Sequence, residues 1–284
     1  MIIAATEAVL KTEIVEDPAD PRIADYRDAR EERSRRAAGL FLAEGRLVVR
    51  RLLEGSRFRA RSLLLTERAL DDLRDVIGGR ETPLVYVAST PVIRSIVGFK
   101  FHRGCLALGE REPPLPVETV TGPDGPRVVL ALEALADPDN VGAVFRNAAA
   151  FGVAGVLLSP GCADPLYRKA IRVSMGATLS TPFAQVAWPT GLGALRAAGY
   201  TLVALAPDGR AEAIARVVER GLPSRRLALL LGSEGAGLSD RTREAADLCV
   251  RIPMAPGVDS LNVATASGIA LHRLASGIMS AARP

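Results

Sequence analysis

The chain is organised around the sequence DPDNVGAVFRNAAAFG at residues 137–152. It follows the apolar run VVLAL at residues 128–132, which is typical of a buried parallel strand. A helix is predicted to begin directly afterwards, with Asn140 capping its first turn. Asn140 and Arg146 are therefore expected at the mouth of a strand–loop–helix unit, where open α/β sheets bind their ligands. The alternative is a capped helix with a surface arginine, and this segment by itself does not decide between the two.

A second segment, ALLLGSEGAGLSD at residues 228–240, reads as an apolar strand that enters a glycine-rich loop and then a capped helix. Glycines in such a loop allow positive φ angles and close approach of a ligand to the backbone. Many ordinary strand–helix turns also contain glycine, so the pattern alone favours a structural turn.

A third segment, VRIPMAPGVDSLNVA at residues 250–264, predicts a short strand, a Pro/Gly loop and a C-terminal helix beginning near Ser260. Ser260 and Asn262 would lie at the helix start, where free N–H groups and small polar side chains can position a substrate. Taken by itself, the segment favours an ordinary loop with a serine cap.

Together and in this order, the three segments resemble the SpoU-type (TrmH-like) RNA 2′-O-ribose methyltransferases of the SPOUT superfamily. The matching elements are the Asn-x5-Arg block with its following Phe-Gly, the Gly-x-Glu-Gly loop, and the Ile-Pro-Met…Ser-Leu-Asn-Val block, within roughly residues 127–280. The family usually has asparagine before the glutamate of the second loop, whereas this chain has Ser233. Serine keeps a donor and an acceptor but loses the amide.

The resemblance implies an α/β fold with a C-terminal parallel-sheet SPOUT domain, a trefoil knot and a homodimer packed through that domain. It implies S-adenosyl-L-methionine as the cofactor and structured RNA as the substrate. The residues that it assigns to the cofactor are Leu231, Gly232, Gly235, Ile252, Met254, Ser260 and Leu261. Those that it assigns to catalysis are Arg146, Asn140, Glu234, Ser260 and Asn262.

Arg146 is the residue expected to act on the reacting hydroxyl. A guanidinium keeps its proton at any ordinary pH, so we expect a cation that binds the adjacent phosphate and stabilises the nascent alkoxide rather than a base. Asn140, Glu234, Ser260 and Asn262 would hold Arg146 and the ribose in place. Recognition of a 2′-hydroxyl also favours RNA over DNA.

The first third of the chain predicts a compact α/β unit over residues 37–112, after an N-terminal extension at 1–36. Residues 41–53 are expected to form a helix with one apolar face, and strands are expected near 62–65, 84–87 and 104–109. FLAEG at 41–45 and FHRG at 101–104 resemble a small RNA substrate-binding domain related to ribosomal protein L30e.

A Pro/Gly-rich linker at 113–126 separates this unit from the SPOUT domain at 127–284. Strands near 128–132, 154–158, 201–205, 227–231 and 248–252 alternate with helices in the second domain, which predicts a parallel sheet covered on both faces.

The formal net charge is only +4, and charge alone slightly favours a solvated helix with Arg–Glu pairs over an RNA-facing module. Residues 22–61 contain 12 arginines and 6 acidic residues, which suits an RNA-facing module, while a solvated helix with Arg–Glu pairs would show the same composition. We expect ribosomal RNA as the substrate. The alternatives are a transfer RNA 2′-O-methyltransferase and a non-catalytic RNA-binding protein of the same fold.

Other functional classes find little support in the sequence. The three cysteines are widely spaced, so neither a metal site nor a disulfide framework is expected. No Gly-x-Gly-x-x-Gly follows the first strand of the second domain, which argues against a nicotinamide-dependent oxidoreductase. Without a signal pattern or a membrane-length apolar run, we expect a cytoplasmic protein.

Overall fold

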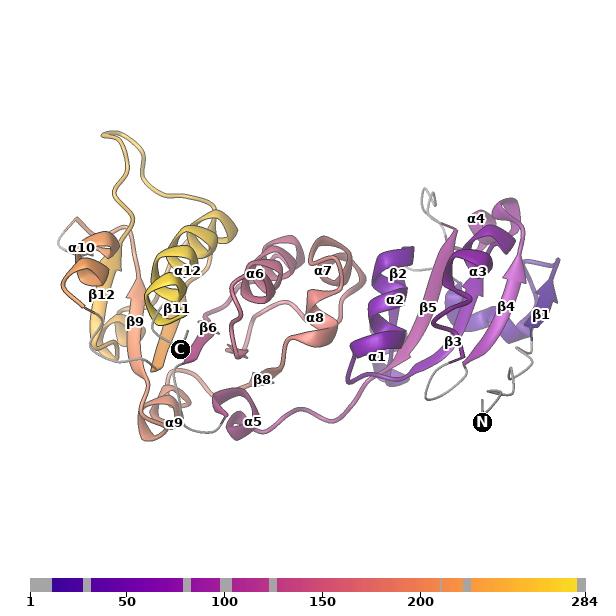
Figure 1. Cartoon of the computed structure of the whole chain (residues 1–284), viewed down its shortest axis with the longest axis horizontal. Helices are drawn as coiled ribbons and strands as arrows, with labels where there is room; N and C mark the ends of the chain where they lie inside the picture. The colour runs from indigo at the N-terminus through magenta and orange to yellow at the C-terminus, as the bar shows by residue number, and fades with distance from the viewer. Residues whose placement is uncertain are drawn as a thin grey trace, which may run out of the picture. The chain divides into compact units, whose positions relative to one another are not determined.

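The computed structural model describes residues 12–27, 32–78, 83–97, 104–122, 127–209, 211–221 and 226–279. The chain forms two compact units (Figure 1). The first comprises Met1–Glu112 and Leu166–Ser180, and the second comprises Pro113–Pro165 and Thr181–Pro284.

The first unit is built on a five-stranded sheet of order β1-β4-β3-β5-β2. β1, β4 and β3 are parallel, and β5 is antiparallel to both β3 and β2. The strands are β1 Thr12–Val15, β2 Leu40–Glu44, β3 Ala60–Leu65, β4 Leu84–Ala88 and β5 Cys105–Glu110. The helices are the 3-10 helix Pro21–Tyr26, α1 Glu32–Ala37, α2 Arg46–Gly55, α3 Glu67–Leu73, α4 Thr90–Val97, α7 Arg168–Val173 and α8 Ala177–Ser180.

The predicted helix over residues 41–53 was wrong in its first part. Leu40–Glu44 is strand β2, in which every residue is buried and which pairs with β5; helix α2 begins only at Arg46. A short run that is buried on both faces has no period-2 alternation, so its pattern cannot be told from that of a buried helix turn.

The segment before α1 is also part of the first unit. β1 pairs with β4, and Ile23 and Tyr26 are fully buried, with the Tyr26 hydroxyl 2.8 Å from that of Ser62. This arrangement differs from the extension that the sequence led us to expect over residues 1–36. The FHRG motif and the second half of the linker lie largely outside the described residues.

The second unit contains a seven-stranded sheet of order β10-β12-β9-β11-β6-β7-β8 in which every pair is parallel. The strands are β6 Arg127–Leu132, β7 Gly155–Leu158, β8 Phe183–Gln185, β9 Thr201–Leu205, β10 Glu212–Ala213, β11 Arg226–Leu231 and β12 Leu248–Arg251. The five predicted strands and the parallel sheet are confirmed. β8 and β10 escaped prediction because they are too short for a recognisable pattern.

Helices cover both faces of this sheet. They are α5 Val117–Thr121, α6 Pro138–Ala150, α9 Leu192–Ala197, α10 Ile214–Glu219, α11 Asp240–Glu244 and α12 Val263–Met279. Leu130 of β6 packs in one core with residues of α6 and α12, whereas the next residue, Ala131, packs in a second core with residues of α9. Figure 1 shows α6 beside α12, and the loop between β12 and α12 extends away from the sheet. The trefoil knot stays a prediction.

Residues 166–180 pack with the first unit, although they follow β7 in the sequence. Arg168 of α7 forms an ion pair of 2.7 Å with the buried carboxylate of Glu44 on β2. Ser56 donates a hydrogen bond of 3.2 Å to the carbonyl of Leu179 in α8. The contacts thus group this segment differently from the continuous domain expected over residues 127–284.

Among the described helices, none combines the length and the apolar character needed to cross a bilayer.

Candidate active site

The first two motifs meet because their strands are neighbours. β6 and β11 pair in register, with Leu132 opposite Leu231, so the loops that follow them leave the same edge of the sheet. The Glu133 N–H donates to the Leu231 carbonyl at 2.8 Å, and the Glu133 carboxylate accepts a hydrogen bond of 2.9 Å from the N–H of Ser239. Glu133, which the sequence did not single out, therefore holds the far end of the glycine-rich loop.

Two of the three glycines in the glycine-rich loop, Gly232 and Gly235, differ in whether the fold requires them. A Cβ on Gly232 would collide with the backbone of Gly237 and Leu238, because the loop closes on itself through a β-bridge between Ser233 and Gly237. A Cβ on Gly235 would meet no atom within 4 Å. Gly232 is thus required by the loop itself, whereas nothing in the folded chain requires glycine at position 235.

The third motif joins the first two through side chains. The side-chain N–H of Asn140 donates a hydrogen bond to the carboxylate of Glu234, and the side-chain N–H of Asn262 donates one of 2.9 Å to the Asn140 oxygen. These three predicted catalytic residues therefore form one chain of hydrogen bonds that links the three motifs.

One expected helix cap was wrong, and α12 begins a few residues later than expected. Asp137 caps α6 by accepting from the N–H of Asp139, which leaves the Asn140 side chain inside the first turn and available to Glu234. α12 begins at Val263 rather than near Ser260, and Asn262 caps it by accepting from the N–H of Ala264 at 2.9 Å. In both cases the side chain nearest to the first free amides is the cap.

Asn147, which was not predicted as a site residue, anchors α6 to α12. Its side chain donates to the Ala264 carbonyl at 2.7 Å and to the Ser267 hydroxyl at 2.9 Å. Gly268 permits this close packing, since a Cβ there would lie 3.3 Å from the Asn147 amide nitrogen. The sequence could have indicated Asn147, because it is the second asparagine of the first motif.

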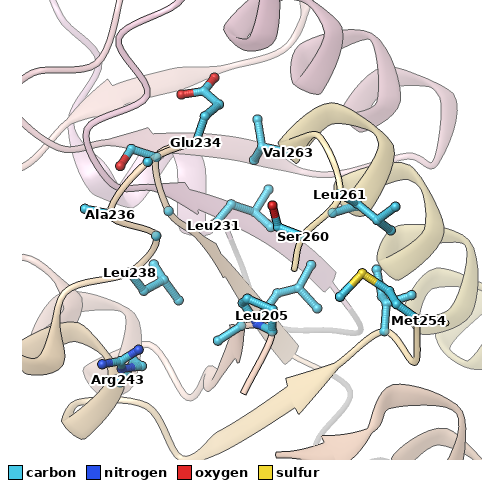
Figure 2. Close-up of a pocket in the computed structure, with 18 residues that line it drawn as sticks. Leu205, Leu231, Glu234, Ala236, Leu238, Arg243, Met254, Ser260, Leu261 and Val263 are labelled. Carbon is cyan, nitrogen blue, oxygen red and sulfur yellow. The ribbon is translucent and has the colours of Figure 1, made fainter. Parts of the chain in front are cut away.

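A cavity of about 220 Å³ opens beside the glycine-rich loop (Figure 2). All the residues predicted to bind the cofactor line it: Leu231, Gly232, Gly235, Ile252, Met254, Ser260 and Leu261. Glu234 also lines it, whereas Asn140 is linked to the cavity through its hydrogen bond to Glu234, and Asn262 through its hydrogen bond to Asn140.

The cavity has further walls that the sequence analysis missed. Leu205, Ala206 and Pro207 come from the end of β9, which lies next to β11 in the sheet. Arg243 of α11 also lines the cavity. Its guanidinium donates a hydrogen bond to the carboxylate of Asp240, and this bond raises the pKa of the guanidinium above its usual value. The strand predicted at residues 201–205, with Pro207 shortly after it, could have indicated that the turn after β9 contributes to the site.

Arg146 lies apart from this network. Its side chain is exposed on α6, does not line the cavity and, within the described residues, makes no hydrogen bond or ion pair. Asn140, Glu234 and Asn262 hold one another here, rather than Arg146 as expected. The arginine is therefore open to a ligand from solvent. No cluster of three His, Cys, Asp or Glu residues suited to a metal ion is found in the described parts of the chain.

The chain is similar to known RNA methyltransferases. The model of the SpoU rRNA Methylase family matches residues 127–272. An uncharacterized tRNA/rRNA methyltransferase of Mycobacterium tuberculosis is 44% identical over 265 residues, which cover 90% of this chain and 89% of the relative. The 23S rRNA (guanosine-2′-O-)-methyltransferase RlmB of a Burkholderia species is 35% identical over 182 residues, with 63% and 72% coverage.

Solved structures that superpose on this chain are also named as RNA methyltransferases. The AdoMet-bound rRNA methyltransferase of Sinorhizobium meliloti superposes with a TM-score of 0.77 at 26% identity and covers 93% of this chain and 97% of its own. The structure of an RNA 2′-O ribose methyltransferase superposes with a TM-score of 0.76, also at 26% identity. The parallel sheet, the meeting of three motifs at one cavity and these similarities lead to one assignment: the chain belongs to the SpoU rRNA methylase family.

Proposed function

We propose that this chain transfers the methyl group of S-adenosylmethionine to a ribose 2′-hydroxyl of ribosomal RNA, using Asn140, Arg146, Glu234, Ser260 and Asn262. As a member of its family, it is an RNA methyltransferase that uses S-adenosylmethionine. The observation that supports the location of the site best is the hydrogen-bonded chain from Asn262 through Asn140 to Glu234 at the cavity.

The cavity suits an adenosine-containing cofactor. Apolar side chains such as Leu231, Ile252 and Leu261 can enclose an aromatic ring, while the glycine-rich loop exposes backbone donors and acceptors for its polar edge. The free space over Gly235 allows a ligand to approach the backbone there. When bound, S-adenosylmethionine supplies an electrophilic methyl group on a sulfonium.

The residues of the chain would then align the 2′-hydroxyl with that methyl group and stabilise the charge on the oxygen. Alignment of reacting groups can contribute about 7–11 kcal/mol to rate acceleration, and a well-placed donor adds about 3–4 kcal/mol. Arg146, a permanent cation on an exposed helix surface, would bind the neighbouring phosphate and stabilise the developing alkoxide. The Asn140–Glu234 contact would fix the loop against which the ribose is held.

Ribosomal RNA is our choice of substrate because several relatives carry the name 23S rRNA (guanosine-2′-O-)-methyltransferase. Transfer RNA is the second candidate, since the relatives with 44% identity are named tRNA/rRNA methyltransferases. We also propose that the chain acts as a homodimer through its C-terminal domain, and that the first unit binds RNA.

Mapping of 2′-O-methyl groups in total RNA from a deletion strain and its parent tests the function directly. Loss of a methylated nucleotide in ribosomal RNA, restored by the wild-type gene and not by Arg146→Ala, is the expected result. A site lost from transfer RNA instead would select the second candidate. Unchanged methylation of both RNAs would contradict the proposal, and light scattering of the purified protein checks the dimer.

A further inference from the structure

A second cavity, of about 620 Å³, lies entirely within the first unit. Its walls are formed by Arg46, Leu47, Thr66, Arg68, Ala69, Asp72, Thr90 and Gly104. None of these residues belongs to the three motifs of the candidate active site. The volume is within the range of about 300–1,000 Å³ that is typical of small-molecule sites, and it is much larger than a single phosphate or water needs.

The topology of the sheet explains why these residues meet. β3 and β4 are parallel, and β2 runs in the same direction because β2 and β3 are both antiparallel to β5. The C-terminal ends of β2, β3 and β4 therefore share one edge of the sheet, where α2, α3 and α4 begin. The cavity is lined from these three strand–helix turns, the position at which open α/β sheets bind ligands.

The lining is cationic. Arg46 and Arg68 face a single acidic residue, Asp72, with which Arg46 forms an ion pair. Arg68 is exposed and, in the described part of the chain, makes no hydrogen bond or ion pair. The Arg46 side chain keeps 52% of its surface exposed, so an anion can reach both guanidinium groups.

The remaining walls fit the other parts of a nucleotide. Leu47 is 44% exposed and provides an apolar surface for a base. The Thr90 hydroxyl can hydrogen-bond to ribose or phosphate oxygens, whereas the Thr66 hydroxyl is already engaged: it donates to the Gly104 carbonyl and accepts from the N–H of Ala69.

We infer that this cavity holds one nucleotide of the RNA substrate, with its phosphate on Arg46 and Arg68 and its base against Leu47. The inference rests on the proposed function and deepens it, since it assigns part of RNA recognition to residues far from the methyl-transfer motifs in the sequence. The two-pronged guanidinium geometry suits phosphate, and single bases that leave an RNA helix are the parts that proteins read most readily.

The test compares full-length variants for binding to protein-free ribosomal RNA purified from a strain of the source organism that lacks this gene, in filter assays at several salt concentrations. Arg46→Ala and Arg68→Ala should each lower the affinity for RNA roughly tenfold. Each should also make the slope of log K against log salt concentration less negative by about 0.7–0.9, the value for one phosphate contact. Arg46→Ala combined with Asp72→Asn should bind as weakly as Arg46→Ala, because the loss comes from the missing cation and not from an unpaired carboxylate.

Arg74→Ala is the matched control. Arg74 also pairs with an aspartate of α3, Asp71, and its removal deletes the same charge, but Arg74 does not line the cavity. The affinity of Arg74→Ala for RNA should stay within about twofold of wild type. The affinity for S-adenosylmethionine should be unchanged in all variants.

Equal RNA affinity of the Arg46, Arg68 and Arg74 variants, with wild-type methyl transfer intact, would overturn the inference and leave the proposed function standing. Failure of the wild-type protein itself to bind or methylate ribosomal RNA would overturn both. Ultraviolet cross-linking gives an independent readout: RNA-linked peptides should include residues 46–47 or 66–72, and their absence among abundant cross-links elsewhere would contradict the site.

Discussion

The side-chain amide of Asn262 donates a hydrogen bond of 2.9 Å to the side-chain oxygen of Asn140, 122 positions earlier in the chain. The same Asn262 side chain accepts hydrogen bonds from the N–H groups of Ala264 and Thr265 and so caps α12. One residue thus starts the C-terminal helix and ties it to the first motif. Its two roles use different atoms, which makes them separable by mutation.

Asn262→Asp should separate the two roles. The carboxylate keeps the oxygen that caps α12 but loses the N–H that binds Asn140, so stability should remain near wild type while methyl transfer falls by one to two orders of magnitude. Asn262→Ala should lose the same transfer activity and also about 1 kcal/mol of stability, the usual value of an N-cap. Urea unfolding and single-turnover transfer of labelled methyl measure the two effects. Full activity of Asn262→Asp would show that the contact with Asn140 is not needed.

Alanine substitutions at Gly232 and Gly235 of the glycine-rich loop should have different effects. Gly232→Ala places a Cβ against the backbone of Gly237 and Leu238, so the loop must open and the protein should lose stability. Gly235→Ala meets nothing in the folded chain and should fold normally, but it should weaken S-adenosylmethionine binding at least tenfold if the cofactor lies over the loop. Thermal unfolding and calorimetric titration of both variants check this. Unchanged cofactor affinity in Gly235→Ala would place the ligand elsewhere.

Arg146→Ala should abolish methyl transfer and leave S-adenosylmethionine affinity nearly intact, because Arg146 does not line the cavity. An effect confined to the transition state slows the chemical step by orders of magnitude without a matching change in cofactor affinity. Arg146→Lys should restore little, since a compact ammonium lacks the two-pronged geometry of a guanidinium. Near-normal transfer by Arg146→Ala would refute the role, and a collapse of cofactor affinity would assign Arg146 to the binding site instead.

Glu44→Gln should destabilise the protein, because Glu44 is buried and its carboxylate pairs with Arg168 of α7. Loss of a hydrogen bond between charged groups costs about 1.5–3 kcal/mol. Arg59→Ala, which removes the exposed 3.9 Å pair with Glu110, is the control and should change stability by about 0.5 kcal/mol or less. Limited proteolysis should cleave Glu44→Gln earlier between residues 166 and 180. Equal stability of the two variants would mean that α7 gains little from its contact with β2.

The sequence by itself determined the parallel sheet of the second unit and the three loops that lead to the site. Strands β6, β7, β9 and β11 are apolar runs bounded by turn residues, because a parallel strand that is covered on both faces buries nearly all its side chains. The seven residues that the family resemblance assigns to the cofactor line one cavity, because they lie at or beyond the ends of β11 and β12. The sequence was sufficient to predict an element wherever the residues that define it lie within a few positions of one another.

Only the tertiary structure decided which side chains meet. β11 lies between β6 and β9, so the wall formed by Leu205–Pro207 and the contact of Asn140 with Glu234 depend on strand order, which no local pattern encodes. The same holds for β2, which only Gly45 separates from α2 and its apolar residues, and for α7, which packs on a strand more than 100 residues earlier. Caps followed a similar rule: Asp137 rather than Asn140 caps α6, because the backbone path sets which oxygen reaches the free amides. Contacts between residues distant in sequence form only when separate strands pair and their apolar faces pack together. The free energy that stabilises these contacts comes from the assembled core, so no single segment of the sequence specifies them.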